Sequence, residues 1–280
     1  MKTPKHLVPL VAAFVATTAF AIAQEATDSP APTRPASAPS ATPVAVRSDG
    51  VLKLGSGFNY SSGDYGFTQK TELWSVPLNL SYDIDRWAFK AGFSYLTIKG
   101  PANVATGTTP APGPARPSSA TESGLGDTSV SATYHAHPVP GELNVDFTAR
   151  VKLPTANENR GLGTGKTDYY IQSDLSETFG KVTAFVTLGY RFMGTSTTSP
   201  LKDGPFATMG AAYALPDGTV IGAAYDWQSR IVAGADPGSN AIAFAARNLS
   251  DHWNLLGYGL VGFNDASPDY GLGGLVTYKF

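Results

Sequence analysis

Apolar and polar residues alternate in many short segments of the chain, so that odd and even positions would form two different faces of a strand. The charged side chains fall on one of these two faces, or parities. Ten of them are candidates for acting together, and each is predicted to lie on the polar face of its segment. They are Lys53, Lys90, Asp146, Arg150, Lys152, Asp174, Arg191, Asp226, Arg230 and Arg247. Charges of both signs on one side of a wall can line a hydrated pathway, or can pair with one another and fill a closed interior. We favour the pathway, and the alternation leaves both interpretations open.

Two local patterns resemble binding motifs but lack parts of them. The stretch from Gly161 to Thr167 reads GLGTGKT, yet the first glycine of a phosphate-binding loop is needed at position 160, which is Arg160. His135 and His137 could share a metal ion, but no third ligand has a clear spacing to them. We therefore predict no nucleotide site, no metal site and no cofactor.

The elements that must position the charges are twelve alternating segments, most of them near the 9–11 residues that a tilted strand needs to cross a bilayer. They cover about 51–60, 74–82, 87–95, 128–136, 143–153, 168–177, 182–192, 205–215, 219–228, 240–247, 253–263 and 269–280. Alternation over so many segments predicts an all-β fold, a transmembrane antiparallel up-and-down β-barrel of about 12 strands over residues 50–280, of the bacterial outer-membrane type. Two features fit poorly: Pro77 lies inside the second segment, and 253–263 is apolar on both parities.

Connections and tryptophans give this barrel an orientation. Short connections, such as 83–85, 179–181 and 249–252, alternate with long ones, such as 100–126 and 154–166, as periplasmic turns alternate with external loops. Trp74 and Trp227 fall at predicted external strand ends, and Trp87 and Trp253 at periplasmic ends, all on the apolar face, as in aromatic girdles. A soluble β-protein would place tryptophans at strand centres facing a core. An even strand number returns the C-terminus to the periplasm.

The N-terminal region predicts export. Lys2 and Lys5 precede an apolar stretch, and Ala21-Ile22-Ala23 is a small-x-small cleavage site, so residues 1–23 are read as a cleaved signal peptide. Residues 24–49 are read as a Pro/Ala-rich disordered periplasmic linker. Export and the barrel together predict the outer membrane of a Gram-negative cell, with lipid and lipopolysaccharide as partners. The linker and the C-terminus are expected on the periplasmic side.

Composition excludes further classes. The chain has no cysteine, which rules out disulfides and cysteine metal sites. Removing Lys2 and Lys5 takes the basic residues from 20 to 18 against 22 acidic residues, a net charge of about −4. A nucleic-acid partner would favour a basic face, so none is expected.

Two segments have predicted roles of their own. Tyr278 and Phe280 end the last alternating strand, and such a terminal aromatic resembles the signal by which barrels reach their assembly machinery, which we count as a partner. Residues 101–120, which contain five prolines, could fold inward as a plug, but a mobile external loop is the favoured interpretation.

An outer-membrane hydrolase is the enzymatic alternative. It would place a histidine base near the external rim, whereas His135, His137 and His252 fall at predicted periplasmic turns and His6 in the signal peptide. No Gly-x-Ser-x-Gly elbow is present, and only a carboxylate-only mechanism remains. We predict that the chain is not an enzyme.

Four glycine-rich motifs carry a resemblance to a known family. They are residues 122–127 (ESGLGD), 151–155 (VKLPT), 161–168 (GLGTGKTD) and 188–192 (LGYRF). In this order they resemble outer-membrane transporters labelled "MetA-pathway of phenol degradation", a resemblance that covers about residues 50–280. It implies a barrel linked to the uptake of aromatic or other small organic solutes and supplies no catalytic residues. The predicted function is passive transport of such a solute, with an interaction or adhesion barrel with a closed lumen as the alternative.

Overall fold

The computed structural model describes residues 50–106, 109–111, 117, 119–136, 143–195 and 200–280. The predicted signal peptide and linker, at 1–23 and 24–49, lie outside the described residues. The strands are β1 (Val51–Gly63), β2 (Thr71–Ile84), β3 (Trp87–Lys99), β4 (Asn103–Thr106), β5 (Thr109–Ala111), β6 (Thr121–Leu125), β7 (Thr128–Ala136), β8 (Leu143–Leu153), β9 (Asp168–Phe179), β10 (Val182–Phe192), β11 (Gly204–Ala214), β12 (Thr219–Gln228), β13 (Gly238–Asn248), β14 (Trp253–Gly262) and β15 (Tyr270–Lys279), and a 3₁₀ turn, η1, covers Glu158–Arg160.

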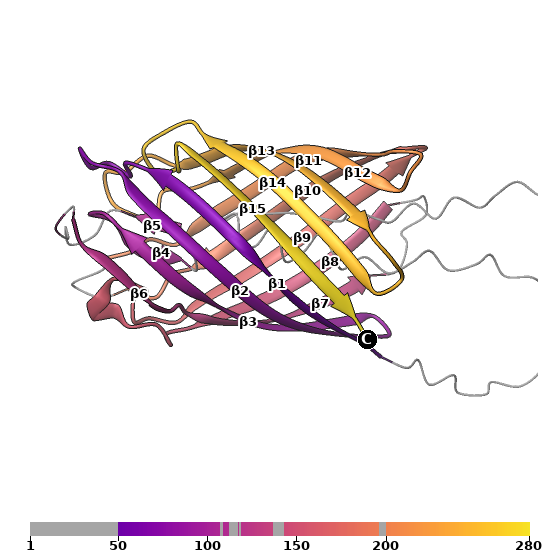
Figure 1. Cartoon of the computed structure of the whole chain (residues 1–280), viewed down its shortest axis with the longest axis horizontal. Coiled ribbons are helices and arrows are strands. Elements are labelled where there is room, and N and C mark those ends of the chain that lie inside the picture. The colour runs from indigo at the N-terminus through magenta and orange to yellow at the C-terminus, as the bar shows by residue number, and fades with distance from the viewer. Residues whose placement is uncertain (1–49, 107–108, 112–116, 118, 137–142, 196–199) are drawn as a thin grey trace, which may run out of the picture.

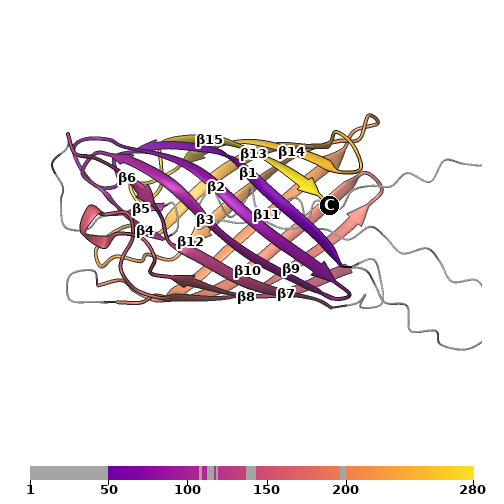
Figure 2. The same ribbon diagram turned by 60° about the horizontal axis from the view of Figure 1, so that its bottom comes forward.

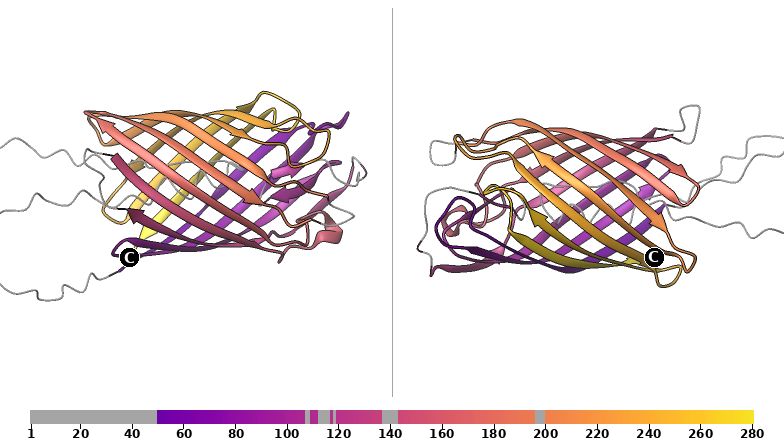
Figure 3. Two further views of the ribbon diagram at one scale, coloured as in Figure 1. Left: turned by 180° about the vertical axis from the view of Figure 1, so that it is seen from behind. Right: turned by 90° about the horizontal axis from the view of Figure 1, so that it is seen from above.

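The main sheet closes on itself. Its strands pair antiparallel, and the first strand, β1, also pairs with the last, β15, so the indigo strand β1 and the yellow strand β15 lie side by side in Figure 1. Strands β6 and β7 follow one another along β3 and act as one wall strand, which gives a 12-stranded barrel. Figure 3 shows the tilted strands continuing around the back of the molecule. The predicted fold class and strand number are confirmed.

A β-bulge separates β6 from β7. Gly92 of β3 pairs with Ser129, whereas Leu96 pairs with Gly124, so the β6–β7 side carries one residue more than β3 across the gap. The extra residue shifts the parity of the wall strand, because strand side chains alternate between the two faces. The assignment of 121–125 to a loop was therefore wrong. The shift also explains why alternation was not detected across this region.

Pro77 sits at a gap in the β1–β2 ladder. Pairing runs from the N-terminal side of β1 to Ser56 opposite Leu78 and resumes at Asn59 opposite Ser75. Proline has no backbone N–H to donate, so a gap in the ladder at this residue leaves no N–H of its own unpaired. The carbonyl oxygen of Pro77 is still used, since the Ser56 hydroxyl donates to it at 2.9 Å.

The outer face of the barrel is apolar. Trp74, Trp87 and Trp253 are 43%, 44% and 46% exposed, and large aliphatic or aromatic side chains point outward on all the wall strands except β13, whose outward residues include Ala243 and Ala245. In β14 the outward residues are Leu255 and Val261, which settles the facing of the strand whose pattern was ambiguous. Such a belt is far larger than the apolar patches of soluble monomers, and hydrocarbon is the environment that suits it. Among the described residues, no helix has the length and apolar character needed to span a membrane.

The two ends of the barrel differ. One end, here called the turn end, holds short connections such as Gly180-Lys181, where Gly180 has a φ of +65° that suits glycine. Both chain ends of the barrel meet there, since the Phe280 N–H donates to the Leu52 carbonyl at 2.9 Å. The opposite end, the loop end, carries the long connections and the β4–β5 hairpin (Figure 2). The predicted alternation of short and long connections is thus confirmed for the described connections.

Candidate functional site in the barrel interior

The inner face of β10–β15 is a packed apolar core. Eleven buried side chains from these six consecutive strands form one cluster. They are Phe185, Ala212, Val220, Ala224, Ile242, Phe244, Ala246, Leu256, Tyr258, Leu260 and Leu275. Side chains packed at this density leave little room for a solute. This part of the interior therefore stabilises the barrel.

The inner face of β7 and β8 is different, because its polar side chains are partly exposed. The inward residues are Ser131, Thr133 and His135 on β7 and Asp146, Thr148 and Arg150 on β8. The side chains of His135 and Asp146 retain 19% and 22% exposure. Thr133 and Thr148, which lie farther from the strand ends, are partly exposed as well, and an inward side chain there faces the space inside the barrel. Accessible space thus follows this wall.

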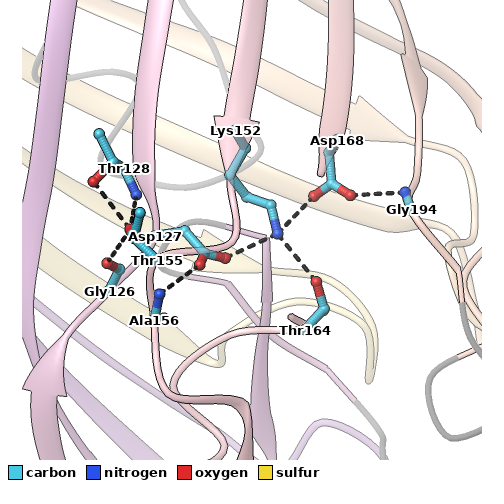
Figure 4. A network of polar contacts seen from close by, with 9 residues as sticks. All are labelled: Gly126, Asp127, Thr128, Lys152, Thr155, Ala156, Thr164, Asp168 and Gly194. Carbon is cyan, nitrogen blue, oxygen red and sulfur yellow. Dashed lines mark hydrogen bonds and ion pairs between the residues drawn. The ribbon is translucent and has the colours of Figure 1, made fainter. Parts of the chain in front are cut away.

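Lys152 is the centre of a buried polar network near the loop end (Figure 4). Its ammonium nitrogen lies 2.9 Å from Asp127 Oδ2 and 2.9 Å from Asp168 Oδ2, and it donates to Thr164 Oγ1 at 3.1 Å. The side chains of Lys152, Asp127 and Asp168 are 4%, 2% and 0% exposed. Opposite charges so well removed from water are held by one another.

The same network fastens the connections at the loop end. Asp127 Oδ1 accepts from the Ala156 N–H at 3.0 Å, and Asp168 Oδ1 accepts from the Gly194 N–H at 2.8 Å. Ala156 and Thr164 lie in the β8–β9 connection, and Gly194 follows β10 (Figure 4). Lys152 was predicted to line a pathway. Its burial instead places it in a structural network that ties these connections to the wall strands.

Arg191 and Asp226 form a second buried polar region. Both are 0% exposed. Arg191 donates to Gln228 Oε1 at 2.6 Å and to the Ser229 carbonyl, while Asp226 accepts from Thr208 Oγ1 at 3.0 Å and from Asn240 at 3.3 Å. Both side chains face inward as predicted, and with their hydrogen-bond partners they fill part of the interior. These residues support the closed-interior alternative for their part of the wall.

Further predicted residues also face inward and are partnered. Asp174 accepts from Thr187 Oγ1 at 2.6 Å and is 7% exposed. Asp146 lies 2.9 Å from His135 Nδ1, and Lys53 lies 2.8 Å from Asp83.

Lys90 is partly exposed on the inner parity of β3, between the wall strands β2 and β7.

Arg247 and Arg230 depart from the prediction. Arg247 shares the outward parity of Ala243 and Ala245, and at the turn end it pairs with Asp217 at 3.0 Å, with 49% of its side chain exposed. The alternation misassigned it because both faces of β13 are apolar, with alanines outward and Ile242 and Phe244 inward, so the pattern does not fix the facing. Arg230 follows β12 and is exposed at the loop end, beyond the wall.

The β4–β5 hairpin packs against the loop-end mouth. Val104 is 1% exposed and belongs to one buried cluster with Leu96 and Ile98 of β3 and Leu162 of the β8–β9 connection. The Val104 N–H donates to the Gly161 carbonyl at 2.9 Å. Leu96 and Ile98 are inward residues, so the described part of 101–120 folds onto the interior. The preference for a mobile external loop was wrong for these residues, since apolar contacts hold them.

Two network residues, Asp127 and Asp168, were not predicted. The alternation of β9 could have predicted Asp168 as an inward residue, because it lies on the same parity as Tyr170 and Asp174. Asp127 stands at the bulge, where parity gives no information. The glycine-rich segment 161–166 is explained by its position under the hairpin and beside Lys152. Within the described residues, no group of three metal-ligating side chains is found.

Comparisons with solved structures identify the fold. The COG4313 outer-membrane channel from Pseudomonas putida F1 aligns with a TM-score of 0.63 at 15% identity over 86% of this chain and 100% of that chain. The NanC porin aligns with a TM-score of 0.51 at 9% identity over 82% of this chain and 100% of that chain.

These likenesses show a closed 12-stranded antiparallel β-barrel that resembles bacterial outer-membrane barrels. At such identities they show the fold alone. No family model and no curated protein matches the chain, and the resemblance to the phenol-degradation transporters therefore stays a prediction.

Proposed function

We propose that this protein is a passive outer-membrane channel for small organic solutes, and that aromatic compounds are among them. The observation that carries the proposal is the partly exposed polar wall formed by the inner faces of β7 and β8. A solute moving along it would meet hydroxyl groups and charges on one side and the packed apolar cluster of β10–β15 on the other. The fold it shares with the Pseudomonas putida outer-membrane channel supports a channel function.

Orientation belongs to the same proposal. The turn end, with the N-terminal side of β1 and the C-terminus, would face the periplasm, and the loop end the exterior, in keeping with short turns and long loops. The β4–β5 hairpin would then narrow the external mouth, because its Val104 packs on inward residues of β3.

Single-channel conductance of refolded protein in planar bilayers tests the proposal. Full-length protein is compared with a variant in which a short Gly-Ser linker replaces residues 101–120. A matched control shortens the exposed β12–β13 connection at 233–236. We expect conductance steps that grow when 101–120 is removed and stay unchanged in the control. Absence of conductance steps in all three proteins would contradict the proposed channel function and favour a barrel that acts through its external loops.

A further inference from the structure

Strand register aligns basic residues into one row on the inner wall. Consecutive neighbours across seven strands, β1, β2, β3, β7, β8, β9 and β10, are Lys53, Ser81, Lys90, Ser131, Arg150, Tyr170 and Arg191. Four of the seven are cationic and none is acidic. Since the strands are tilted, a row perpendicular to them climbs from the turn end at Lys53 toward the loop end at Arg191 (Figure 1).

Acidic residues align into a second row nearer the turn end. Register joins His135, Asp146, Asp174, Thr187, Thr208, Asp226 and Asn240 across β7–β13. On β8 the two rows are four residues apart, at Arg150 and Asp146, or roughly 13 Å along the strand. The row between them is uncharged, with Thr133, Thr148 and Gln172 in register. On β8 the backbone positions of the two charged rows are thus separated by an uncharged row.

Arg150 is the accessible part of the basic row. It is partly exposed, and its guanidinium carbon lies over the Tyr170 ring, 4.2 Å from the ring centre, in a cation–π contact. Within the described residues, no carboxylate oxygen lies within 4.0 Å of its nitrogens. A guanidinium stacked on a ring keeps its N–H edges free for a planar, bidentate acceptor.

Neighbours of Arg150 complete a site. Ser131 is its partner on β7 and also the partner of Lys90 on β3, so a hydroxyl stands between two cations on the accessible wall. The buried carboxylates of Asp127 and Asp168 are already engaged by Lys152. A positive, donor-rich surface of this kind suits an anion.

We propose that Arg150, with Ser131 and Lys90, binds the carboxylate group of a small organic anion inside the barrel. The inference rests on the proposed function, since the bound anion is taken to be a solute on its way through. It adds a substrate class: organic carboxylates, held by their charged group while the rest of the molecule faces the interior.

Equilibrium binding to refolded protein in detergent micelles tests this site without requiring conductance. Benzoate is the probe, and benzamide, which has nearly the same shape without the charge, is its neutral control. We expect benzoate to bind more tightly than benzamide. Arg150→Gln should lower the affinity for benzoate by about tenfold or more and leave benzamide unchanged, because a charge-assisted hydrogen-bonded pair is lost. The matched control is Arg247→Gln, which changes an exposed arginine on the outer face of β13 and should bind benzoate as the parent protein does.

Refolding of each variant is judged by heat-modifiable gel mobility. If Arg150→Gln does not refold, Ser131→Ala, which keeps all charges, is the alternative test of the site. It should lower benzoate affinity about threefold, the loss of one hydrogen bond. Equal affinity of the parent and a refolded Arg150→Gln or Ser131→Ala protein would overturn the site. So would full displacement of benzoate by an equal concentration of inorganic phosphate. Either result leaves the proposed function intact if conductance is seen, whereas absent conductance removes the proposed function whatever binds.

Discussion

The ammonium nitrogen of Lys152 lies 2.9 Å from a carboxylate oxygen of Asp127, although 25 residues separate the two in the chain. Asp127 stands at the bulge between β6 and β7, and Lys152 near the end of β8. Their contact, with that of Asp168, holds three wall strands and two connections together at the loop end.

Lys152→Gln should destabilise the barrel strongly. It leaves two buried carboxylates without a cation, and breaking a buried pair in this way costs about 3–5 kcal/mol. The free energy of unfolding, measured by urea titration in lipid vesicles, checks this. Lys181→Gln, at an exposed turn, is the control and should change it by less than about 0.5 kcal/mol. Equal stability of the two variants would contradict the structural role assigned to the network.

Arginine substitutions at two adjacent positions of β8 test which residues of this strand face outward and which face inward. Ala149 is exposed on the outer parity, and Thr148 faces inward at the middle of the strand. Ala149→Arg should reduce folding into bilayers by about 2–4 kcal/mol, because its charge would face lipid near the midplane. Thr148→Arg should be better tolerated. Similar folding yields of the two variants would show that the facing of β8 is wrong.

Single cysteines can test the orientation, because the natural chain contains none. Asp236→Cys lies at the loop end and Asp251→Cys at the turn end, both at exposed positions. We expect a membrane-impermeant maleimide to label Asp236→Cys in intact cells and Asp251→Cys only after the outer membrane is opened. The reverse pattern would invert the topology, while labelling of neither in opened cells would rule out exposure of these connections.

Removal of Phe280 tests the predicted assembly signal. Phe280 is 63% exposed, and its ring lies 4.9 Å from that of Tyr278 at the end of β15. If these rings are read by the assembly machinery, the shortened chain should accumulate less in the outer membrane of cells yet refold normally in detergent. Phe263→Ala, an exposed aromatic beyond β14, is the control. Equal loss of refolding in detergent would instead make Phe280 part of barrel stability.

Local pattern was enough to predict the strands and most of their faces. Alternation in β2 and β3 predicted outward Trp74 and Trp87, and the structure confirms them, because a strand turns each successive side chain to the opposite face. It failed at the bulge before Asp127, where that geometry is interrupted, and at Arg247 of β13, where both faces of the strand are apolar and the pattern does not fix the facing.

The sequence by itself determined the class of the protein, since the period of its side chains and the lengths of its segments depend only on neighbours along the chain. Tertiary structure decided which inward charges meet. The register of adjacent strands brings Lys152 to Asp127 and Asp168, aligns Arg150 with Ser131 and Tyr170, and leaves the charged rows apart. Register is a relation between segments that are distant in sequence, and no pattern within one segment can specify it.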